Sequence, residues 1–188
     1  MAVKYPQWQL SKSAINKETC EAIIMMCKQL NQEDATVFSG REVQNDIRRS
    51  KVAWVPRNNS TEFIYQIVQK YLYDANMVFN MTVNKIPSIQ FTQYDGDDEA
   101  FYNYHIDTNM TDDSDRHRKI SIVIQLSDPK DYEGGDFDFR YLENPDKEDI
   151  KAQGSILTFI SYHDHRVVPV TSGTRYSLVC WQEGPRFR

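Results

Sequence analysis

The sequence predicts an α+β fold in which two N-terminal helices support a larger β region of the antiparallel sandwich or jelly-roll type. Two observations lead to this fold class. Apolar residues recur at helical spacing only within about the first 80 residues. From residue 78 onward, short runs rich in β-branched and aromatic residues alternate with turn signals, as in sandwiches and jelly rolls. We expect one domain over residues 1–188, with mainly helical support in residues 1–80 and the β core in residues 81–188.

Two helices and one short strand are predicted in the supporting part. The first helix follows Asn16, a favourable N-cap residue. The second follows Ser60-Thr61-Glu62 and extends toward Met77. Between them, residues 51–55 form a predicted strand that ends at Pro56. The apolar positions at helical spacing are Cys20, Ile23, Ile24, Cys27 and Leu30 in the first helix, and Phe63, Ile64, Ile67, Val68, Tyr71 and Leu72 in the second.

Eight strands are predicted in the β core, separated by turns that contain glycine, proline or aspartate. They are Val78–Val83, Ser88–Tyr94, Tyr102–Asp107, Lys119–Leu126, Asp136–Arg140, Ser155–Phe159, His165–Val170 and Arg175–Gln182. Because neither helix has enough apolar partners of its own, we expect both helices to pack on the outside of one sheet. The two parts therefore belong to one domain.

Composition excludes several classes of protein. The net charge of −5 and the pI near 5.4 argue against a nucleic-acid partner, which needs a clustered basic surface. No run of residues approaches the roughly 20 apolar residues of a membrane span, and the first residues lack the apolar core of a signal peptide. The three cysteines contain no Cys-x-x-Cys pair, so we expect reduced thiols in a cytoplasmic protein rather than a zinc site.

The residues that carry chemistry lie in two distant segments. His105 and Asp107 are two apart, so in an extended strand both side chains point the same way. If a second strand brings in His165, two histidines and one carboxylate converge. This ligand set occupies one face of an Fe(II) ion and leaves the opposite coordination positions open. Arg175 and Ser177 share one face of the last strand, where a buried arginine needs an anion. The pattern indicates an iron site with a dicarboxylate co-substrate.

Other interpretations of these residues exist. Alone, His105-x-Asp107 is also compatible with a polar pair on the rim of a sheet. His163 is two residues from His165 and would share its face, and a His-x-His pair suits a cupin-type metal site. The local pattern therefore leaves the choice between His163 and His165 open. His117 lies in a charged stretch and is expected in a solvated loop.

The second half of the chain resembles the prolyl 4-hydroxylase-like branch of the 2-oxoglutarate/Fe(II)-dependent dioxygenases. The resemblance covers about residues 88–183, and its segments follow the order of that family. They are Gln90-Phe-Thr-Gln-Tyr94, Tyr102-x-x-His105-x-Asp107, Arg118 to Pro129, Tyr132-Glu-Gly-Gly-Asp136, Gly154 to Phe159, and His165-Arg-Val-Val-Pro-Val followed by Thr174-Arg175-Tyr-Ser177 and Trp181. The family's fold is a double-stranded β-helix, which agrees with the predicted strands.

The resemblance implies a role for each matching residue. His105, Asp107 and His165 match the iron ligands, because the family's second histidine directly precedes the Val-x-Pro-Val segment. Arg175 matches the residue that binds the distal carboxylate of 2-oxoglutarate, and Ser177 lies in the Arg-x-Ser pattern that assists it. The remaining matches are Tyr94 and Tyr102, which line the pocket for co-substrate and substrate, and Gln125, which stands where some members carry a tyrosine to the co-substrate.

The implied activity is hydroxylation that uses Fe(II), 2-oxoglutarate and O2, with ascorbate as a reductant. A protein side chain, prolyl in particular, is the first expected substrate, and a free amino acid or another small molecule is the second. A non-catalytic metal-binding interaction domain is the competing class, and the intact ligand set with Arg175 argues against it. The acidic segments 95–99 and 112–115 flank the strand with His105, so they either favour a basic substrate or serve only as solubilising turns.

Overall fold

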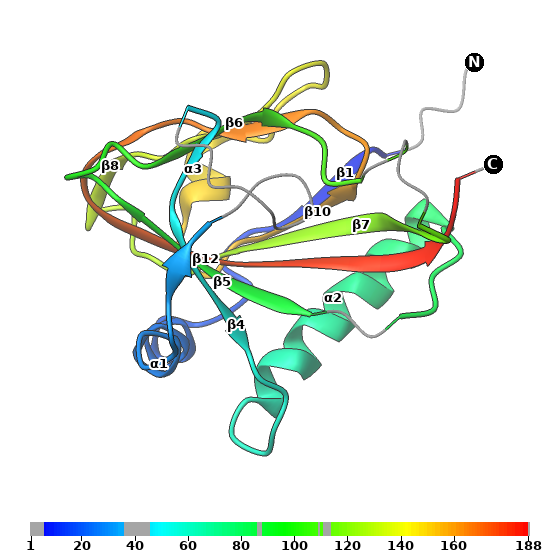
Figure 1. Cartoon of the computed structure of the whole chain (residues 1–188), viewed down its shortest axis with the longest axis horizontal. Coiled ribbons are helices and arrows are strands. Elements are labelled where there is room, and N and C mark those ends of the chain that lie inside the picture. Colours follow the sequence, from blue (N-terminus) through cyan, green and yellow to red (C-terminus); the bar gives the residue numbers. More distant parts are fainter. Residues whose placement is uncertain (1–5, 36–45, 86–87, 109, 111–113, 188) are drawn as a thin grey trace.

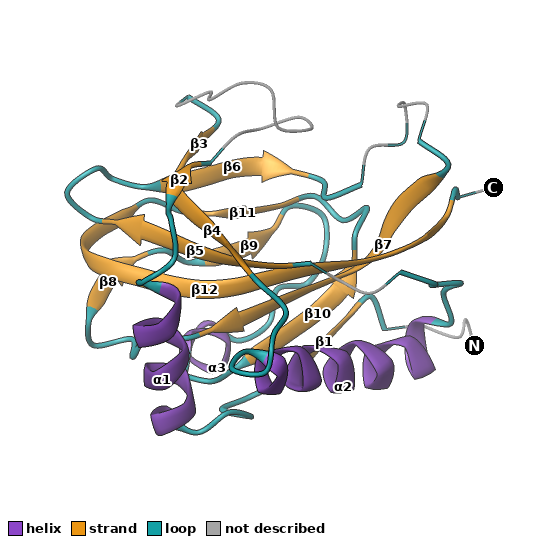
Figure 2. Cartoon of the chain, turned by 60° about the horizontal axis from the view of Figure 1, so that its bottom comes forward, coloured by secondary structure: helices purple, strands orange, loops and turns teal. Residues whose placement is uncertain are grey.

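Two antiparallel sheets that face each other form the body of the molecule, and the two longer helices lie on the outer side of the larger sheet (Figures 1 and 2). The structure is a computed structural model that describes residues 6–35, 46–85, 88–108, 110 and 114–187. All strand pairings in these residues are antiparallel. The predicted α+β fold of the double-stranded β-helix type is confirmed.

Within the described residues, the larger sheet has eight strands. Its order is β1 (Trp8–Ser11), β10 (Ile156–Ile160), β7 (Arg116–Gln125), β12 (Val170–Pro185), β5 (Ile89–Asp95), β4 (Lys51–Val55) and β2 (Glu33–Asp34), and β8 (Tyr132–Gly134) pairs with β12. The smaller sheet has the order β3 (Arg48–Arg49), β6 (Phe101–His105), β11 (His165–Val167) and β9 (Phe137–Phe139). The first and last strands among the described residues thus lie in the same sheet.

Each central strand of the larger sheet has one face toward the helices and one toward the smaller sheet. In β7, Ile120, Ile122 and Ile124 belong to the main apolar core beneath the helices. Ser121 and Gln125 alternate with these isoleucines, so they point toward the smaller sheet. This alternation places polar side chains of β7 in the space between the two sheets, next to an apolar cluster of Phe137, Phe139, Leu157 and Phe159.

Two helices cover the outer face of the larger sheet (Figure 2). α1 (Lys17–Cys27) begins at Asn16, whose side chain accepts from the backbone N–H of Thr19, as the N-cap prediction requires. α2 (Glu62–Phe79) buries one stripe of side chains at helical spacing, namely Ile64, Tyr65, Val68, Leu72, Ala75 and Phe79. A short third helix, α3 (Lys147–Lys151), follows β9. None of the described helices combines the length and apolar character needed to cross a membrane.

The predicted strand Val78–Val83 is wrong. α2 continues through Phe79, which lies one turn beyond Ala75 and packs in the same core. The helix ends at Asn80, whose φ of 51° is the left-handed conformation common after a last helical turn. The β-branched residues of this segment suggested a strand, but the burial of Phe79 outweighs that weak local preference.

The first 80 residues also supply more strand than expected. β1 and β4 lie in the larger sheet and β3 in the smaller one, so this part contributes to both sheets and not only to a helical support. β1, β3, β8 and α3 are too short for their periodicity to be read from the sequence. Of the other predicted strands, seven coincide with β5, β6, β7, β9, β10, β11 and β12, and Lys51–Val55 is β4.

The three cysteines are buried free thiols, as expected. Burial raises the pKa of the Cys20 thiol to about 11 and that of the Cys27 thiol to about 12. These side chains therefore pack as small apolar groups and are poor nucleophiles and poor metal ligands.

We expect Leu72→Ala to destabilise the protein by about 2–5 kcal/mol, because it opens a cavity where α2 packs on the larger sheet. The measurement is the midpoint of urea unfolding. Met77→Ala on the same helix is the matched control, since Met77 is 69% exposed and should change stability by no more than ~0.5 kcal/mol. Equal losses for the two variants would contradict the packing described for α2.

Candidate metal and co-substrate site

Two histidines and one aspartate converge between the sheets. His105, the last residue of β6, and His165, the first residue of β11, are paired directly across the two strands. The Nε2 atoms of His105 and His165 lie 3.6 and 3.7 Å from the two carboxylate oxygens of Asp107. The three ligand atoms lie within 4.8 Å of one another, so a single ion can reach all of them. The structure thus brings together the three residues that the sequence indicated.

Asp107 reaches this point by a route that differs from the prediction. β6 ends at His105, so Asp107 is not the next inward position of an extended strand. Its backbone N–H donates to the carbonyl of Ser161 at 3.0 Å, and its carboxylate accepts from the Ser121 hydroxyl at 2.6 Å. Ser161 also shares a hydrogen bond with Ser121 at 2.9 Å. The larger sheet and the turn after β10 therefore fix the carboxylate.

Backbone carbonyls orient both imidazoles. The Nδ1 atom of His105 lies 2.8 Å from the carbonyl oxygen of Asn103, and that of His165 lies 2.9 Å from the carbonyl oxygen of His163. A carbonyl only accepts, so each Nδ1 carries a hydrogen and Nε2 is the ring nitrogen left to bind a metal ion. This arrangement of donors behind metal-binding histidines fixes the ring and raises the basicity of the ligand.

The charges of the cluster suit a cation. Burial alone would raise the pKa of Asp107, but the neighbouring His165 and His105 hold that pKa well below its usual value. Burial lowers the pKa of His165 to about 4, so its imidazole is neutral near pH 7. One carboxylate and two imidazoles with an open side are the donor set of Fe(II) oxygenases. The residues present fit an iron ion.

A buried cation lies deeper between the sheets. Arg175 on β12 is 4% exposed, and no described residue forms an ion pair or a side-chain hydrogen bond with its guanidinium group. Its Cζ lies 5.5 Å from the centroid of the Tyr94 ring, and Ser177 follows on the same face of the strand. A buried guanidinium without a partner is costly, so it fits the distal carboxylate of a dicarboxylate.

The other residues expected at the co-substrate pocket are also inside. The Tyr102 ring stacks on His105 with a centroid distance of 3.4 Å, and burial raises the pKa of its hydroxyl to about 12. Gln125 is the register partner of Ser177 in the larger sheet, but its amide donates to the Tyr132 hydroxyl and the Ser127 carbonyl. Direct contacts of Tyr94, Tyr102 and Gln125 with a co-substrate stay predictions.

The two remaining histidines lie outside the cluster. The Nε2 atom of His163 is 3.0 Å from the side-chain oxygen of Gln7, just before β1, so His163 does not belong to the cluster around Asp107. The expectation for His117 is wrong, since it is buried in β7 and its Nδ1 accepts from the backbone N–H of Phe187. The charged neighbours of His117 suggested a loop, but the alternation of β7 turns its side chain inward.

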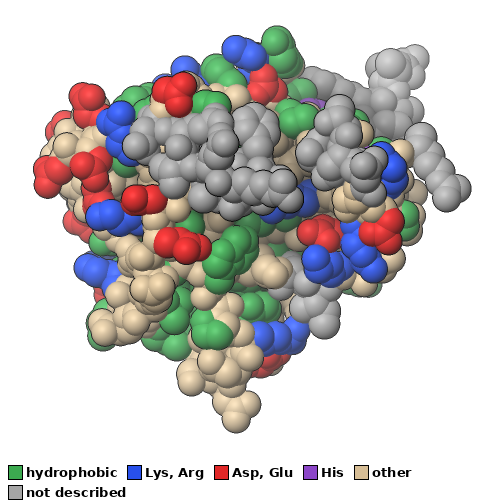
Figure 3. Space-filling model, viewed as in Figure 1, with side chains coloured by type: hydrophobic (Ala, Val, Ile, Leu, Met, Phe, Trp, Pro, Cys, Tyr) green, Lys and Arg blue, Asp and Glu red, His purple; other side chains and the backbone are tan. Residues whose placement is uncertain are grey.

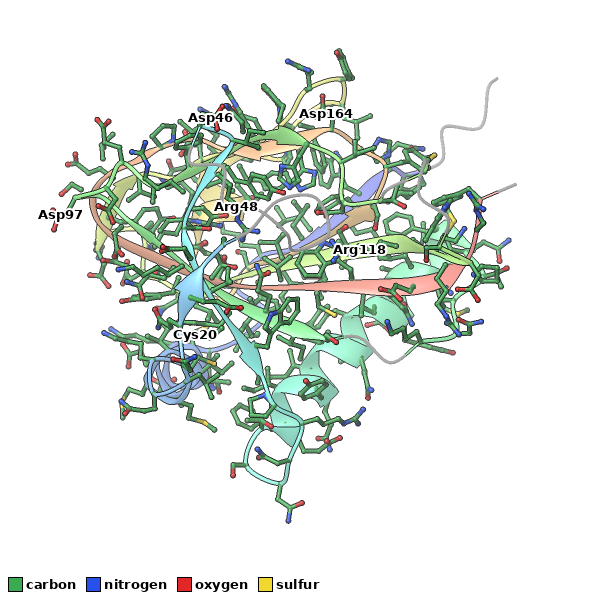
Figure 4. All side chains as sticks on the ribbon, viewed as in Figure 1. Cys20, Asp46, Arg48, Asp97, Arg118 and Asp164 are labelled. Carbon is green, nitrogen blue, oxygen red and sulfur yellow. The ribbon has the colours of Figure 1, made fainter. Side chains whose placement is uncertain are left out.

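A polar cavity of about 540 Å³ lies beside β3 and the turn after β5. Arg48, which lines it, has its Cζ 4.6 Å from the centroid of the Tyr102 ring, and Figure 4 shows it beside β6.

The acidic side chains at the left edge of Figure 3 lie where Figure 4 labels Asp97. Asp95 is 3.8 Å from Lys51 and accepts from Thr174. Lys51 is thus the partner of one carboxylate of this acidic turn, and residues 112 and 113 lie outside the described residues.

Comparison with known sequences identifies the family. The profile of the 2OG-Fe(II) oxygenase superfamily matches residues 89–183, half of the chain, and the chain belongs to this superfamily. A PKHD-type hydroxylase of Gloeothece citriformis is 36% identical over 112 residues, which are 56% of this chain and 48% of that protein. A second, from Synechococcus sp. CC9902, is 30% identical over 64% of this chain and 52% of its own length. The chain spans about half the length of these curated relatives.

Solved structures show the same fold. A prolyl-4-hydroxylase of Pseudomonas putida superposes with a TM-score of 0.73 over 94% of this chain and 92% of its own, at 21% identity. A prolyl hydroxylase of Trichoplax adhaerens in complex with a hypoxia inducible factor oxygen degradation domain peptide fragment gives a TM-score of 0.73 at 18% identity, covering 94% of this chain and 83% of that one. At these identities the likeness establishes the fold.

We expect His165→Ala to lower the affinity for Mn(II), used as an air-stable probe of the iron site, by at least about 100-fold. Loss of a residue that only hydrogen-bonds to a metal ligand typically lowers metal affinity about 10–100-fold, so loss of a ligand should lower it at least as much. His163→Ala is the matched control, because its imidazole lies outside the cluster and should leave the affinity within about twofold. Calorimetric titration with Mn(II) measures both. If His163→Ala loses Mn(II) binding and His165→Ala keeps it, His163 is the metal-binding residue and His165 is not.

Proposed function

We propose that this chain is an Fe(II)- and 2-oxoglutarate-dependent hydroxylase that acts on a prolyl side chain of a protein. One observation carries the proposal: a cluster of two histidines and an aspartate opens onto the same interior that holds a buried arginine without an ion pair among the described residues. The first group supplies a half-filled coordination sphere, and the second supplies an anion site. Together they match one small dicarboxylate and one metal ion.

Each residue would have a defined role. His105, Asp107 and His165 would hold Fe(II), with Ser121 fixing the carboxylate of Asp107. Arg175 would bind the distal carboxylate of 2-oxoglutarate. When iron and 2-oxoglutarate are bound, the chemistry they supply is oxidative decarboxylation to succinate and CO2, coupled to transfer of one oxygen atom of O2 into a substrate C–H bond. The protein's own contribution is to orient these groups and to exclude water from the space between the sheets.

An aromatic surface next to the metal cluster supports a protein substrate. Trp181 on β12 pairs with Ser121, and the Cζ of Arg118 lies 4.0 Å from the centroid of its ring. Arg118 also approaches the backbone carbonyl of Asp107 at 3.4 Å, so this surface adjoins a metal ligand. Trp54, 48% exposed on β4, lies 6.3 Å from Trp181 between ring centroids. Flat aromatic rings pack well against the apolar ring of proline.

An unused donor in this surface favours a peptide over a free amino acid. The Nε1–H group of Trp181 is buried and has no hydrogen-bond partner among the described residues. A peptide backbone offers neutral carbonyl acceptors near the side chain that reacts. The names of the relatives point the same way, since they are PKHD-type and prolyl hydroxylases, and the Trichoplax adhaerens enzyme was solved with a peptide fragment. The three buried free thiols support a cytosolic location.

Release of succinate tests the reaction. Purified protein with Fe(II), 2-oxoglutarate and ascorbate should form succinate, and proline-containing peptides should stimulate the rate and gain 16 Da. Asp107→Ala should abolish both signals. Stimulation by free amino acids, with peptides inert, would replace the protein substrate by a small molecule. No succinate under any condition would refute the enzyme and favour a metal-binding interaction domain.

We expect Arg175→Ala to weaken 2-oxoglutarate binding by about 2–5 kcal/mol, because the contact with a charged ligand is lost inside the protein. Calorimetric titration of 2-oxoglutarate into the Mn(II)-loaded protein measures the change. Mn(II) affinity itself should stay within about twofold, since Arg175 is not among the three residues of the metal cluster. Unchanged affinity for 2-oxoglutarate would mean that another residue anchors its carboxylate.

We expect Trp181→Phe to lower kcat/KM for the peptide by at least about tenfold, since it removes the free indole N–H and part of the aromatic surface. Succinate formation without peptide should change little, because the metal ligands and Arg175 are untouched. Trp54→Phe is the control, and a weaker effect is expected there because Trp54 keeps half of its surface in solvent. If both peptide-dependent and peptide-independent rates fall together, Trp181 only supports the fold.

A further inference from the structure

Tyr132, a residue of β8, places a second hydrogen-bond donor beside Arg175. Tyr132 is 4% exposed, and its hydroxyl lies 3.0 Å from the amide nitrogen of Gln125. The same nitrogen is 3.1 Å from the carbonyl oxygen of Ser127. Because a backbone carbonyl can only accept, the contact with Ser127 fixes which end of the amide is the nitrogen. Both amide hydrogens of Gln125 are then used.

The Tyr132 oxygen therefore acts as the acceptor toward Gln125. Its own hydrogen must point elsewhere, and no described residue accepts it. A buried hydroxyl hydrogen without an acceptor costs free energy, as does the unpaired guanidinium group of Arg175. A single anion placed between these two groups would satisfy both.

The glycine after β8 shows that the two groups border the same space. Gly135 has a φ of +62°, and a Cβ atom built on it would lie 2.9 Å from Cδ of Arg175 and 3.2 Å from Cε2 of Tyr132. The Tyr132 ring and the Arg175 side chain therefore flank one backbone position. Ser177, the register partner of Gln125, adds a third polar group on the facing strand. The three donors surround the inner end of the space between the sheets.

Lys151 fixes the segment from β8 to Asp136, which begins at Tyr132. Lys151 at the end of α3 donates to the backbone carbonyl of Gly134 at 3.0 Å and to the carboxylate of Asp136 at 3.1 Å. Its Nζ atom lies 5.1 Å from the centroid of the Tyr132 ring. Lys151 of α3 therefore contacts the ring of Tyr132, and Gln125 holds its hydroxyl oxygen. A donor fixed in this way binds with little loss of side-chain entropy.

We infer that Tyr132 donates its hydroxyl hydrogen to the carboxylate of 2-oxoglutarate that Arg175 binds, and that Gln125 is a positioning residue that acts through Tyr132. The inference rests on the proposed function and adds a ligand-binding residue to it. It also gives Gln125 a different role from direct contact with the co-substrate. In this arrangement the donor to the co-substrate carboxylate is the phenol of Tyr132 on β8, and not the side chain of Gln125 on β7.

Tyr132→Phe tests the inference, because it removes the hydroxyl and keeps the ring. A hydrogen bond to a charged group is worth enough to predict at least about a tenfold loss of affinity for 2-oxoglutarate. The measurement is calorimetric titration of 2-oxoglutarate into Mn(II)-loaded protein without O2, so turnover is not needed. Mn(II) affinity should stay within about twofold. The control is Tyr141→Phe, since Tyr141 is 80% exposed and should change neither value.

Gln125→Leu tests the indirect role. It should also weaken 2-oxoglutarate binding, and the double variant with Tyr132→Phe should bind like Tyr132→Phe alone. Additive losses would show that Gln125 acts on its own and would overturn its positioning role. Unchanged affinity in Tyr132→Phe, or equal losses of Mn(II) and 2-oxoglutarate affinity, would overturn the role of Tyr132. If the unaltered protein fails to bind 2-oxoglutarate, the proposed function falls and this inference falls with it.

Discussion

The pairing of β6 with β11 is the constraint on which the site depends. It sets His105 directly opposite His165, and the bulge that follows lets β11 diverge toward Val167. A slip of one residue would turn one imidazole to the other face of the sheet, where it could not share an ion with its partner. β9 on the far side of β11 and β3 on the far side of β6 hold this register within the smaller sheet.

The third residue of the metal cluster ties the two sheets together. Asp107 lies beyond the end of β6, and the Ser121 hydroxyl of the larger sheet holds its carboxylate. The cluster therefore forms only when the sheets take their correct separation. An apolar cluster of Phe137 and Phe139 on β9 with Leu157 and Phe159 on β10 packs between the sheets and sets this separation. The helices contribute no residue to the metal cluster, and they cover the outer face of the larger sheet.

Much of this arrangement could be predicted from the sequence, because it depends on local patterns. The spacing of His105 and Asp107, the segment that begins at His165, and the alternation around Arg175 indicated residues that the structure brings to the same interior. Ser121 and Tyr132 were missed as supporting residues, because their roles come from contacts with Asp107 and Gln125 that the sequence does not encode locally. A serine within an apolar strand was the only available signal for Ser121. The resemblance to a family was needed to choose His165 over His163.

Buried polar groups without partners are informative only when several of them converge. The described residues include isolated cases, such as the Thr108 hydroxyl and the Nε2 atom of His117, for which the structure gives no second donor or opposite charge nearby. Arg175 and Tyr132 differ, because Gly135 lies against both side chains, and the unmet donors therefore border one space next to a metal cluster. One buried donor without a hydrogen-bond partner lowers stability only a little. A guanidinium group and a hydroxyl group that both lack partners lower it more, and a bound ligand can remove this cost. A carboxylate would offer these donors both acceptor oxygens and an opposite charge, whereas a neutral group would offer no charge.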